Sequence, residues 1–231
     1  MLTLSRQQAR EVDAIAIKRW GFPGMVLMEN AGRGVVDVLL GIDPRLADEP
    51  ARSVAILCGK GNNAGDGLVI ARQLEIRGAR SQALLLASPT ELRGDARANY
   101  EILSHTDVPI IDLSAATDLP AALATEAADA AWIVDALLGT GARDQPREPF
   151  ATAIRWMNSQ PARRLAIDLP SGLDCDTGQA AAATVRADHT CTFVAPKIGF
   201  LAPAAGDFLG QLHVVSIGIP QPLIDEVLAS R

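Results

Sequence analysis

Apolar, strand-like runs alternate with helix-like stretches through most of this sequence, and no other feature restricts the fold as strongly. The strand-like runs occupy residues 53–58, 81–87, 108–113, 131–138, 163–169, 190–195 and 211–217. The helix-like stretches between the first five runs occupy residues 67–77, 92–104, 119–128 and 149–159. This alternation predicts βαβ units and a mostly parallel sheet with right-handed crossovers. The runs are nearly continuous in apolar residues, as in AWIVDALL, which is typical of strands covered on both faces.

Two helices are predicted before the first strand. Ser5 is a suitable N-cap for a helix that ends at Trp20, and the sequence GFPG at residues 21–24 breaks it. A second helix with apolar residues along one side follows, and residues 44–52 are expected to form a loop. A length of 231 residues suits one α/β domain, so we expect residues 1–231 to form a single domain.

The composition excludes several classes of function. A net charge of −6 and a pI of about 5.1 argue against binding to nucleic acid or to an anionic membrane. The cysteines Cys58, Cys175 and Cys191 form no CxxC pair, which argues against a disulfide framework or a zinc site and favours a reducing compartment. The first residues lack a signal-peptide pattern, and no run approaches the ~18 apolar residues of a membrane helix. We therefore expect a cytoplasmic protein.

A glycine-rich stretch, CGKGNNAGDG, joins the first strand to the next helix. Its first part satisfies the dinucleotide-binding pattern GxGxxG/A, and a helix N-terminus binds phosphate. An ordinary NAD-dependent dehydrogenase would have an acidic residue after the second strand, where this chain has Ala87 and Ser88. A tight turn that needs glycine is the structural alternative. Asn62, Asn63 and Asp66 favour instead a site for a hard cation or for hydroxyl groups.

Two aspartates accompany apolar strands at the same predicted edge of the sheet. Asp135 lies within WIVDALL, and Asp168 lies at the end of LAID. Ligands of open parallel sheets bind at the carboxyl ends of the strands, so we expect both side chains to meet the glycine-rich stretch there. Capping of a nearby turn is the alternative role for each carboxylate. No histidine accompanies them, which disfavours a catalytic triad with Ser171 and favours a carboxylate general acid or base.

Other residues have both a functional and a structural interpretation. Lys197 follows a predicted strand and either reaches the same edge or lies on the surface. Glu29 and Asn30, in the second helix, either face the site or lie on an exposed helix face. The cysteines are most simply small buried residues.

Five segments, spread over nearly the whole chain, resemble the NAD(P)H-hydrate epimerase family, the YjeF N-terminal domain. They are Leu27–Gly32 (LMENAG), Gly59–Gly67, Asp135–Gly141 (DALLGTG), Ala166–Gly172 with Asp174 and Gly178, and Ala195–Lys197. One segment alone would be weak, but the set in the family's order is specific. The resemblance implies an α/β fold of the three-layer α/β/α Rossmann-like type, with a mostly parallel sheet and N-terminal helices.

The resemblance also implies an isomerase that interconverts the R and S forms of hydrated NADH and NADPH at C6 of the nicotinamide ring, in nicotinamide nucleotide repair. The implied substrate-binding residues are Asn62, Asn63, Ala64, Gly65, Asp66, Gly139, Thr140, Gly141, Ala142, Arg143, Asp144, Gln145 and Asp168. The implied potassium (K+) ligands are Asn63, Asp135 and Ser171, all oxygen donors. The family usually has glycine in place of Ala64, a difference that is harmless if Ala64 has an ordinary φ.

These residues predict a mechanism, and the resemblance implies the partners. We expect Asp168 to be the catalytic acid or base near the C6 hydroxyl, and the N–H groups of Gly65–Gly67 and Gly139–Gly141 to bind the pyrophosphate. A separate NAD(P)H-hydrate dehydratase is the expected functional partner, and a homodimer through the N-terminal helices is the expected oligomer. The alternative from another class is a non-catalytic nucleotide-binding or scaffold module of the same fold.

Overall fold

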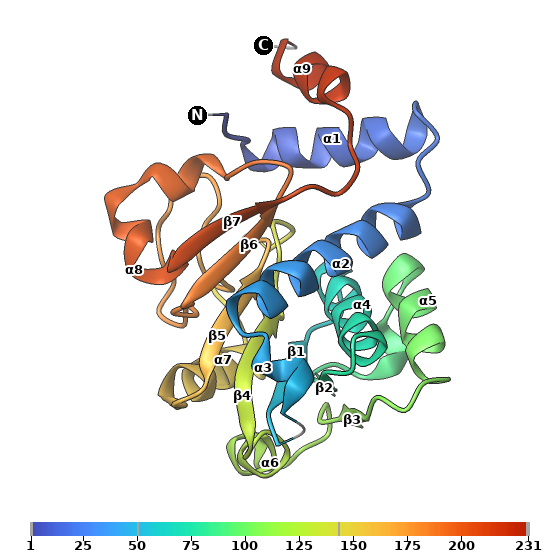
Figure 1. Cartoon of the computed structure of the whole chain (residues 1–231). Helices are drawn as coiled ribbons and strands as arrows, with labels where there is room; N and C mark the ends of the chain where they lie inside the picture. Colours follow the sequence, from blue (N-terminus) through green and yellow to red (C-terminus); the bar gives the residue numbers. More distant parts are fainter. Residues whose placement is uncertain (1, 50, 143, 230–231) are drawn as a thin grey trace.

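Seven parallel strands form one sheet at the centre of the molecule (Figure 1). The computed structural model describes residues 2–49, 51–142 and 144–229. The order across the sheet is β3-β2-β1-β4-β5-β6-β7, and each neighbouring pair is parallel. The strands are β1 Ser53–Cys58, β2 Arg80–Leu85, β3 Ile110–Asp112, β4 Ala130–Ala136, β5 Arg163–Ile167, β6 His189–Phe193 and β7 Gln211–Val215. The predicted parallel sheet is confirmed.

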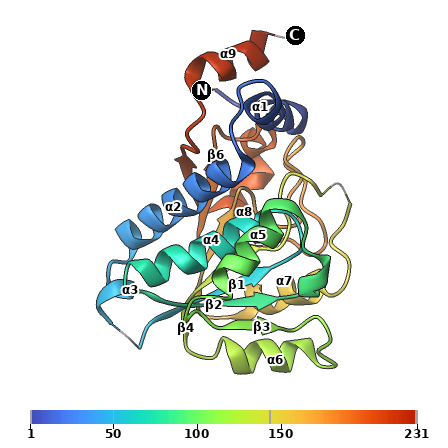
Figure 2. The same cartoon turned by 90° about the vertical axis from the view of Figure 1, so that its right-hand side faces the viewer.

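Helices cover both faces of this sheet, which confirms the three-layer α/β/α arrangement (Figure 2). The α-helices are α1 Arg6–Lys18, α2 Gly24–Ile42, α3 Arg45–Asp48, α4 Asn62–Ile76, α5 Gly94–Leu103, α6 Leu119–Glu126, α7 Phe150–Ser159, α8 Gly206–Leu209 and α9 Gln221–Ala229. Ile56 enters the core under α2, α4 and α5, whereas its neighbour Leu57 enters the core under α6 and α7, as the two-residue period of a strand requires. Short 3-10 helices span Pro89–Glu91, Ile198–Leu201 and Pro203–Ala205.

Boundaries account for most of the differences from the predicted elements. Several predicted strands run too far because apolar residues such as Leu86 and Leu137 stay buried after the strand has ended. The expected loop at 44–52 contains the one-turn helix α3. The alternation pattern does not predict α8 and α9, which follow the sixth strand and the seventh strand.

The largest correction concerns the glycine-rich stretch, whose second half is helical. α4 begins at Asn62, not at residue 67, with Gly61 as an extended N-cap. A Cβ atom on Gly65 would lie 2.6 Å from the sulfur of Met28, and a Cβ on Gly67 would lie 2.7 Å from the Cβ of Ala136. These two glycines therefore allow α4 to pack closely against α2 and the sheet.

The strand order places a switch point between β1 and β4. The chain leaves β1 for α4 on one face of the sheet, and it leaves β4 for α7 on the other face. The N–H of Gly59 still donates to the Ala136 carbonyl (3.1 Å), so the two strands separate only beyond this bond. Open α/β sheets bind ligands in the crevice that such a divergence leaves.

The N-terminal and C-terminal helices α1 and α9 pack against each other beyond the end of β6 (Figure 1). The N–H of Leu4 donates to the Pro196 carbonyl (2.9 Å), and the N–H of Ile198 donates to the Leu4 carbonyl (2.9 Å). In the described part of the chain, none of the helices combines the length and hydrophobicity of a membrane span. The division into a single domain stays a prediction.

Candidate active site

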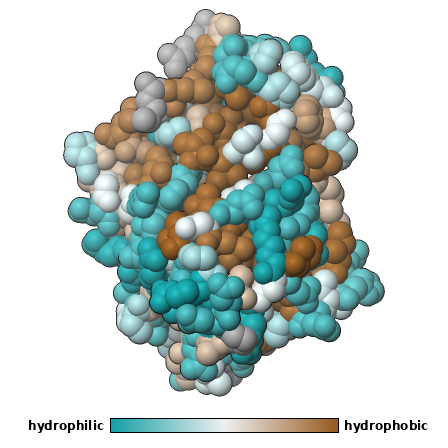
Figure 3. Space-filling view, in the orientation of Figure 1, coloured by the Kyte–Doolittle hydropathy of each residue, from teal (hydrophilic) through white to brown (hydrophobic). Residues whose placement is uncertain are grey.

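A cleft opens at the switch point, between the carboxyl ends of the central strands and helices α1 and α2. It consists of two adjoining cavities of about 140 Å³ and about 430 Å³. Both cavities are lined by Asp13, Asn62, Asp66, Thr140, Asp168 and Phe193. Apolar side chains of α1 and α2 form much of the smaller cavity, and Figure 3 shows apolar surface concentrated in the upper half of the molecule, where these helices lie. Apolar walls with a few convergent polar groups are typical of ligand sites.

Asp168 directly follows β5 in an uncommon backbone conformation. Its φ is +66°, which few residues other than glycine adopt. The N–H of Leu169 donates to the Ile167 carbonyl (2.8 Å), which closes a three-residue turn around Asp168, and the N–H of Asp168 donates to the Cys191 carbonyl of β6 (2.7 Å). Turns of this kind are strained, and such strain clusters at functional sites.

The next strand ends in the same way and brings a lysine to Asp168. Val194 follows β6 with a φ of +67°, and the N–H of Ala195 donates to the Phe193 carbonyl (2.8 Å). Beyond this turn, the Nζ of Lys197 lies 2.7 Å from Oδ1 of Asp168. The Lys197 side chain is only 2% exposed, so its interpretation as a surface residue is wrong and its position at the sheet edge is confirmed.

Two further carboxylates share the cleft with Asp168. Asp66, in the first turn of α4, is buried, and burial together with the negative charges of Asp168 and Asp13 raises its pKa well above the usual value. Asp13 is reached by water, but the protein around it and the charge of Asp168 raise its pKa to about 6, while Lys197 lowers it. Crowded carboxylates with perturbed pKa values are typical of acid–base sites.

Asp135 is completely buried near the end of β4. One carboxylate oxygen accepts the N–H of Ser171 (2.7 Å), and the other accepts the Ser171 hydroxyl (2.6 Å) and the N–H of Leu137 (3.2 Å). Burial raises the pKa of Asp135 to about 6, although these hydrogen bonds lower it. Among the described lysines and arginines, none forms an ion pair with Asp135. Asp135 caps two turns, as its structural interpretation predicts, and its negative charge has no cationic partner there.

The residues expected to bind potassium lie close together around Leu138. The amide of Asn63 donates to the Leu138 carbonyl (3.2 Å), and the hydroxyl oxygen of Ser171 accepts the Leu138 N–H (2.9 Å). Together with Asp135 they form a set of one carboxylate and several neutral oxygens. The chemistry of this set and the uncompensated charge of Asp135 fit a hard cation.

The start of α4 corrects the expected position of the phosphate-binding N–H groups. The N–H of Gly65 donates to the Gly61 carbonyl (3.3 Å) within the first helical turn, so the expected role of Gly65–Gly67 as free donors is wrong. Gly61 has no side chain that could cap the helix, which leaves the N–H groups of Asn62 and Asn63 available. Both asparagines line the larger cavity.

The structure brings most, but not all, of the predicted substrate-binding residues to the cleft. Those that line it are Asn62, Asn63, Asp66, Gly139, Thr140, Gly141, Ala142 and Asp168. Ala64 and Gly65 are buried within α4, and Ala64 has no positive φ, so its methyl group is accommodated. Asp144 and Gln145 line a neighbouring cavity of about 440 Å³. Arg143 lies outside the described residues.

Glu29 and Asn30 do not line either cavity of the cleft, and both have structural partners. Glu29 forms an ion pair with Arg72 and accepts a hydrogen bond from Gln73 (2.5 Å), so it does not face the site. The amide of Asn30 donates to the Ile217 carbonyl (3.0 Å). All three cysteines are free and buried, as expected.

Helix α1 supplies charged residues that the sequence analysis does not select: Arg10 and Asp13 line the cleft, and Arg6 contacts Thr140 and Ala142 beside it. Arg6, Arg10 and Asp13 recur at helical spacing, on a different side of the helix from Val12 and Ile15, which enter the core. The spacing was the available signal, but a charged stripe on a helix usually indicates a solvated face.

Comparisons with known proteins find related sequences over most of this chain. The family model described as YjeF-related protein N-terminus matches residues 24–199. The NAD(P)H-hydrate epimerase of Pirellula staleyi is 47% identical over 222 residues, which cover 96% of this chain and 95% of that protein. The NAD(P)H-hydrate epimerase of Rhodopirellula baltica is 41% identical, with 94% of this chain and 85% of that protein covered.

A longer relative and a solved structure extend the comparison. The bifunctional NAD(P)H-hydrate repair enzyme Nnr of Salinibacter ruber is 39% identical over 97% of this chain, which matches 42% of that enzyme. The crystal structure of yeast ynu0 aligns with a TM-score of 0.82, covering 98% of this chain and 93% of its own. Its sequence identity is 23%, so this likeness concerns the fold alone.

Proposed function

This chain belongs to the family of YjeF-related protein N-termini, and on that premise we propose that it is an NAD(P)H-hydrate epimerase. This isomerase interconverts the R and S forms of hydrated NADH and NADPH at C6 of the nicotinamide ring. Two relatives with this name are 47% and 41% identical over most of their length. The activity belongs to nicotinamide nucleotide repair, which is supported by the name of the bifunctional relatives, NAD(P)H-hydrate repair enzyme.

The observation that carries this function is the pair of Asp168 and Lys197 inside the cleft. Epimerisation at C6 requires a proton to move at the hydroxyl oxygen while water leaves and returns or the ring opens and closes. We assign this proton transfer to Asp168, since a strained turn presents it and the Lys197 ammonium, 2.7 Å away, stabilises its negative charge. Asp66, with its raised pKa, is a second group in the cleft that can hold a proton.

The shape of the cleft supports a dinucleotide ligand. The positive end of α4, with the available N–H groups of Asn62 and Asn63, suits the phosphates in the larger cavity. The smaller cavity, which has several apolar side chains in its wall, suits the hydrated ring next to Asp168. The contacts assigned to Ala64, Gly65, Arg143, Asp144 and Gln145 stay predictions.

Asn63, Asp135 and Ser171 are the proposed potassium ligands. When bound, the ion would supply the positive charge that Asp135 lacks among its described neighbours. Ser171 lies in the loop that follows Asp168, and Leu138 lies directly before the loop that begins at Gly139. Hydrogen bonds join these two residues, so the ligand set would hold the two loops in register.

A dehydratase partner, a homodimer and a cytoplasmic location complete the proposal. The bifunctional name of the Salinibacter relative, of which this chain matches 42%, supports a second repair activity as partner. Exposed Ile17, Trp20 and Val26 around the turn between α1 and α2 support a homodimer, which light scattering would refute by a monomeric mass. The free cysteines suit a reducing compartment.

Following the R-to-S ratio of hydrated NADPH by chromatography tests the function directly. We expect the wild type to accelerate epimerisation over the spontaneous rate and Asp168→Asn to lose about 100-fold or more. Asp112→Asn is the matched control, because Asp112 is an exposed aspartate at the end of another strand. A wild type that matches the spontaneous rate would favour a non-catalytic binding module, and full activity in Asp168→Asn would remove this residue from its role.

A further inference from the structure

We propose that Arg6 of helix α1 is a positioning residue for the substrate loop, defined here as residues 139–142. The proposal makes α1 a part of the site. It rests on the proposed function, from which the role of this loop comes. The match to the family model begins at residue 24, after the end of α1, so it includes no residue of this helix.

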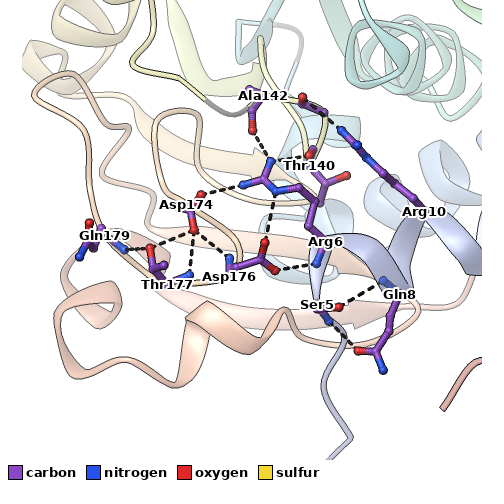
Figure 4. A network of polar contacts seen from close by, with 11 residues as sticks. Ser5, Arg6, Gln8, Arg10, Thr140, Ala142, Asp174, Asp176, Thr177 and Gln179 are labelled. Carbon is purple, nitrogen blue, oxygen red and sulfur yellow. Dashed lines mark hydrogen bonds and ion pairs between the residues drawn. The ribbon is translucent and has the colours of Figure 1, made fainter. Parts of the chain in front are cut away.

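Arg6 joins the substrate loop to a second loop of the protein (Figure 4). Its Nη1 donates to the carbonyls of Thr140 (2.7 Å) and Ala142. On its other side, Nη2 lies 2.7 Å from Oδ2 of Asp174, and Nε lies 3.4 Å from Oδ2 of Asp176. The side chain is only 10% exposed, so these contacts are made away from bulk solvent. The planar guanidinium, with its five donors, can serve all four acceptors.

Asp174, an ion-pair partner of Arg6, is held by hydrogen bonds outside the substrate loop. Asp174 accepts hydrogen bonds from the N–H of Asp176 (3.0 Å) and from the N–H (2.8 Å) and hydroxyl (2.9 Å) of Thr177. Burial alone would raise the pKa of Asp174, but the hydrogen bonds from Thr177 and Asp176 and the charge of Arg6 lower it. Asp174 is therefore a charged and immobile partner at neutral pH.

The start of α1 is also fixed. The hydroxyl of Ser5 accepts the N–H of Gln8 (3.2 Å), and the side chain of Gln8 accepts the N–H of Ser5 (3.0 Å), which together form a capping box (Figure 4). The backbone N–H of Arg6 donates to Oδ1 of Asp176 (2.7 Å). The backbone of Arg6 is thus held before its side chain reaches the substrate loop.

The substrate loop has little else to define its shape. In the described part of the chain, its hydrogen bonds other than those to Arg6 are a turn from the Ala142 N–H to the Gly139 carbonyl (3.0 Å) and a long bond from exposed Arg10 to the Gly141 carbonyl (3.3 Å). Two of its four residues are glycines, which are conformationally permissive. In a trans peptide the C=O and N–H point in opposite directions, so Arg6, through the Thr140 carbonyl, also sets the direction of the Gly141 N–H.

Removal of Arg6 should therefore weaken substrate binding more than chemistry. A loop that is disordered before binding must be ordered by the substrate, and this ordering reduces affinity. Asp168 and Lys197 are held by other elements and should keep their arrangement. A rise in KM with nearly constant kcat is the expected signature.

The experiment compares Arg6→Met and Arg6→Lys with Arg19→Met. Arg19, at the end of the same helix, forms an exposed ion pair with Glu226 and is the matched control. We measure kcat and KM for epimerisation, and amide hydrogen exchange of the peptide that contains residues 139–142. Arg6→Met should raise KM about tenfold, change kcat less than about threefold and speed exchange in this peptide. Arg6→Lys should be intermediate, and Arg19→Met should match the wild type.

A folded Arg6→Met protein with wild-type KM and wild-type exchange of the loop overturns the proposal. If Arg6→Met does not fold, Arg6→Lys decides, because one ammonium cannot serve the loop and both carboxylates at once. Wild-type KM and exchange in that variant would overturn the proposal equally. If the wild type shows no turnover, the proposed function fails, and the exchange measurement still decides whether Arg6 orders the loop.

Discussion

Asp43 and Asp135 are both buried aspartates, but Asp43 lies at the amino end of strand β4 and Asp135 lies near its carboxyl end. Their hydrogen-bond and ion-pair partners also differ. Asp43, at the end of α2, is 2% exposed and forms ion pairs with Arg45 (3.2 Å) and Arg52. It also accepts the indole N–H of Trp132 (3.1 Å), near the amino end of β4. Asp135, near the carboxyl end of the same strand, accepts hydrogen bonds only from neutral donors among the residues that the structure describes.

The pKa values of the two carboxyls follow from these partners. Burial would raise the pKa of Asp43, but the hydrogen bonds from Trp132, Arg52 and Arg45 lower it overall. Burial raises the pKa of Asp135 to about 6 because its neutral donors do not compensate the desolvation. The difference teaches that equal burial does not imply an equal role. Arginines neutralise the charge at the amino end, whereas the charge near the switch point has no cationic partner among the described residues.

The largest expected effect tests whether Asp43 and its ion pairs stabilise the fold. Asp43→Ala leaves Arg52 and Trp132 without their acceptor, so we expect the free energy of unfolding to fall by about 3–5 kcal/mol. The epimerase activity per folded molecule should stay at the wild-type value, because Asp43 lies far along the sheet from the cleft. Urea unfolding and the chromatographic assay measure the two quantities. An equally stable variant, or one that is folded but inactive, would contradict the division of roles.

The stability of Asp135→Asn as a function of pH, in potassium-free buffer, tests the role of the buried Asp135 carboxyl. The folded-state pKa of about 6 lies above the usual 3.8, so the folded protein holds this proton more tightly than the unfolded chain does. The resulting stability is present below pH 4 and is lost as the pH rises to 6, by about 3 kcal/mol for two pKa units. Relative to the wild type, Asp135→Asn should therefore gain stability over this window. A constant difference from pH 4 to pH 8 would show that burial does not shift this carboxyl.

Potassium should restore the stability that the wild type loses when Asp135 ionises. Binding of the ion to the ionised carboxylate at pH 8 should stabilise the protein by up to about 2.7 kcal/mol at 100 times its Kd. At pH 5 the protonated carboxyl should respond less, and Asp135→Asn should respond weakly at both pH values. Thermal unfolding with potassium, and with choline as the control cation, measures the effect. Equal stabilisation of both proteins would place the ion elsewhere.

The smallest expected effect on activity concerns Lys197, whose ammonium contacts Asp168 and also donates to the Thr192 hydroxyl (2.8 Å) and the Phe193 carbonyl (3.3 Å). Lys197→Met retains the length of the buried stem but removes the ammonium from Asp168, so we expect kcat per folded molecule to fall about tenfold. Lys197→Arg should recover part of this loss. Lys18→Met, at an exposed position, is the control and should keep the wild-type kcat. An unchanged kcat in Lys197→Met would assign the lysine to structure alone.

The glycine-rich stretch shows where local patterns mislead. Its pattern resembles a phosphate-binding turn, but Gly65 and Gly67 lie inside α4 and permit its contacts with Met28 and Ala136. A glycine that makes a turn and a glycine that allows close packing look alike in a sequence. They are distinguished by residues that lie far away along the chain.

The candidate site was predictable to the extent that it depends on strand ends. The rule that ligands meet the carboxyl ends of parallel strands selected Asp135 and Asp168, and the structure brings both to the switch point. The same rule cannot find Arg6 or Asp13, because α1 reaches the cleft only by packing across the end of the sheet.

The sequence by itself determined the order of the elements, the parallel sheet and its two covered faces, because hydrophobic periodicity and turn residues act over a few neighbouring positions. Only the tertiary structure decided that Lys197 is buried against Asp168, that α4 begins at Asn62 and that Arg6 holds the substrate loop. Each of these depends on which side chains compete for the same space and the same hydrogen bonds. That competition joins residues more than a hundred positions apart, as it does Arg6 and Thr140, and no local pattern contains it.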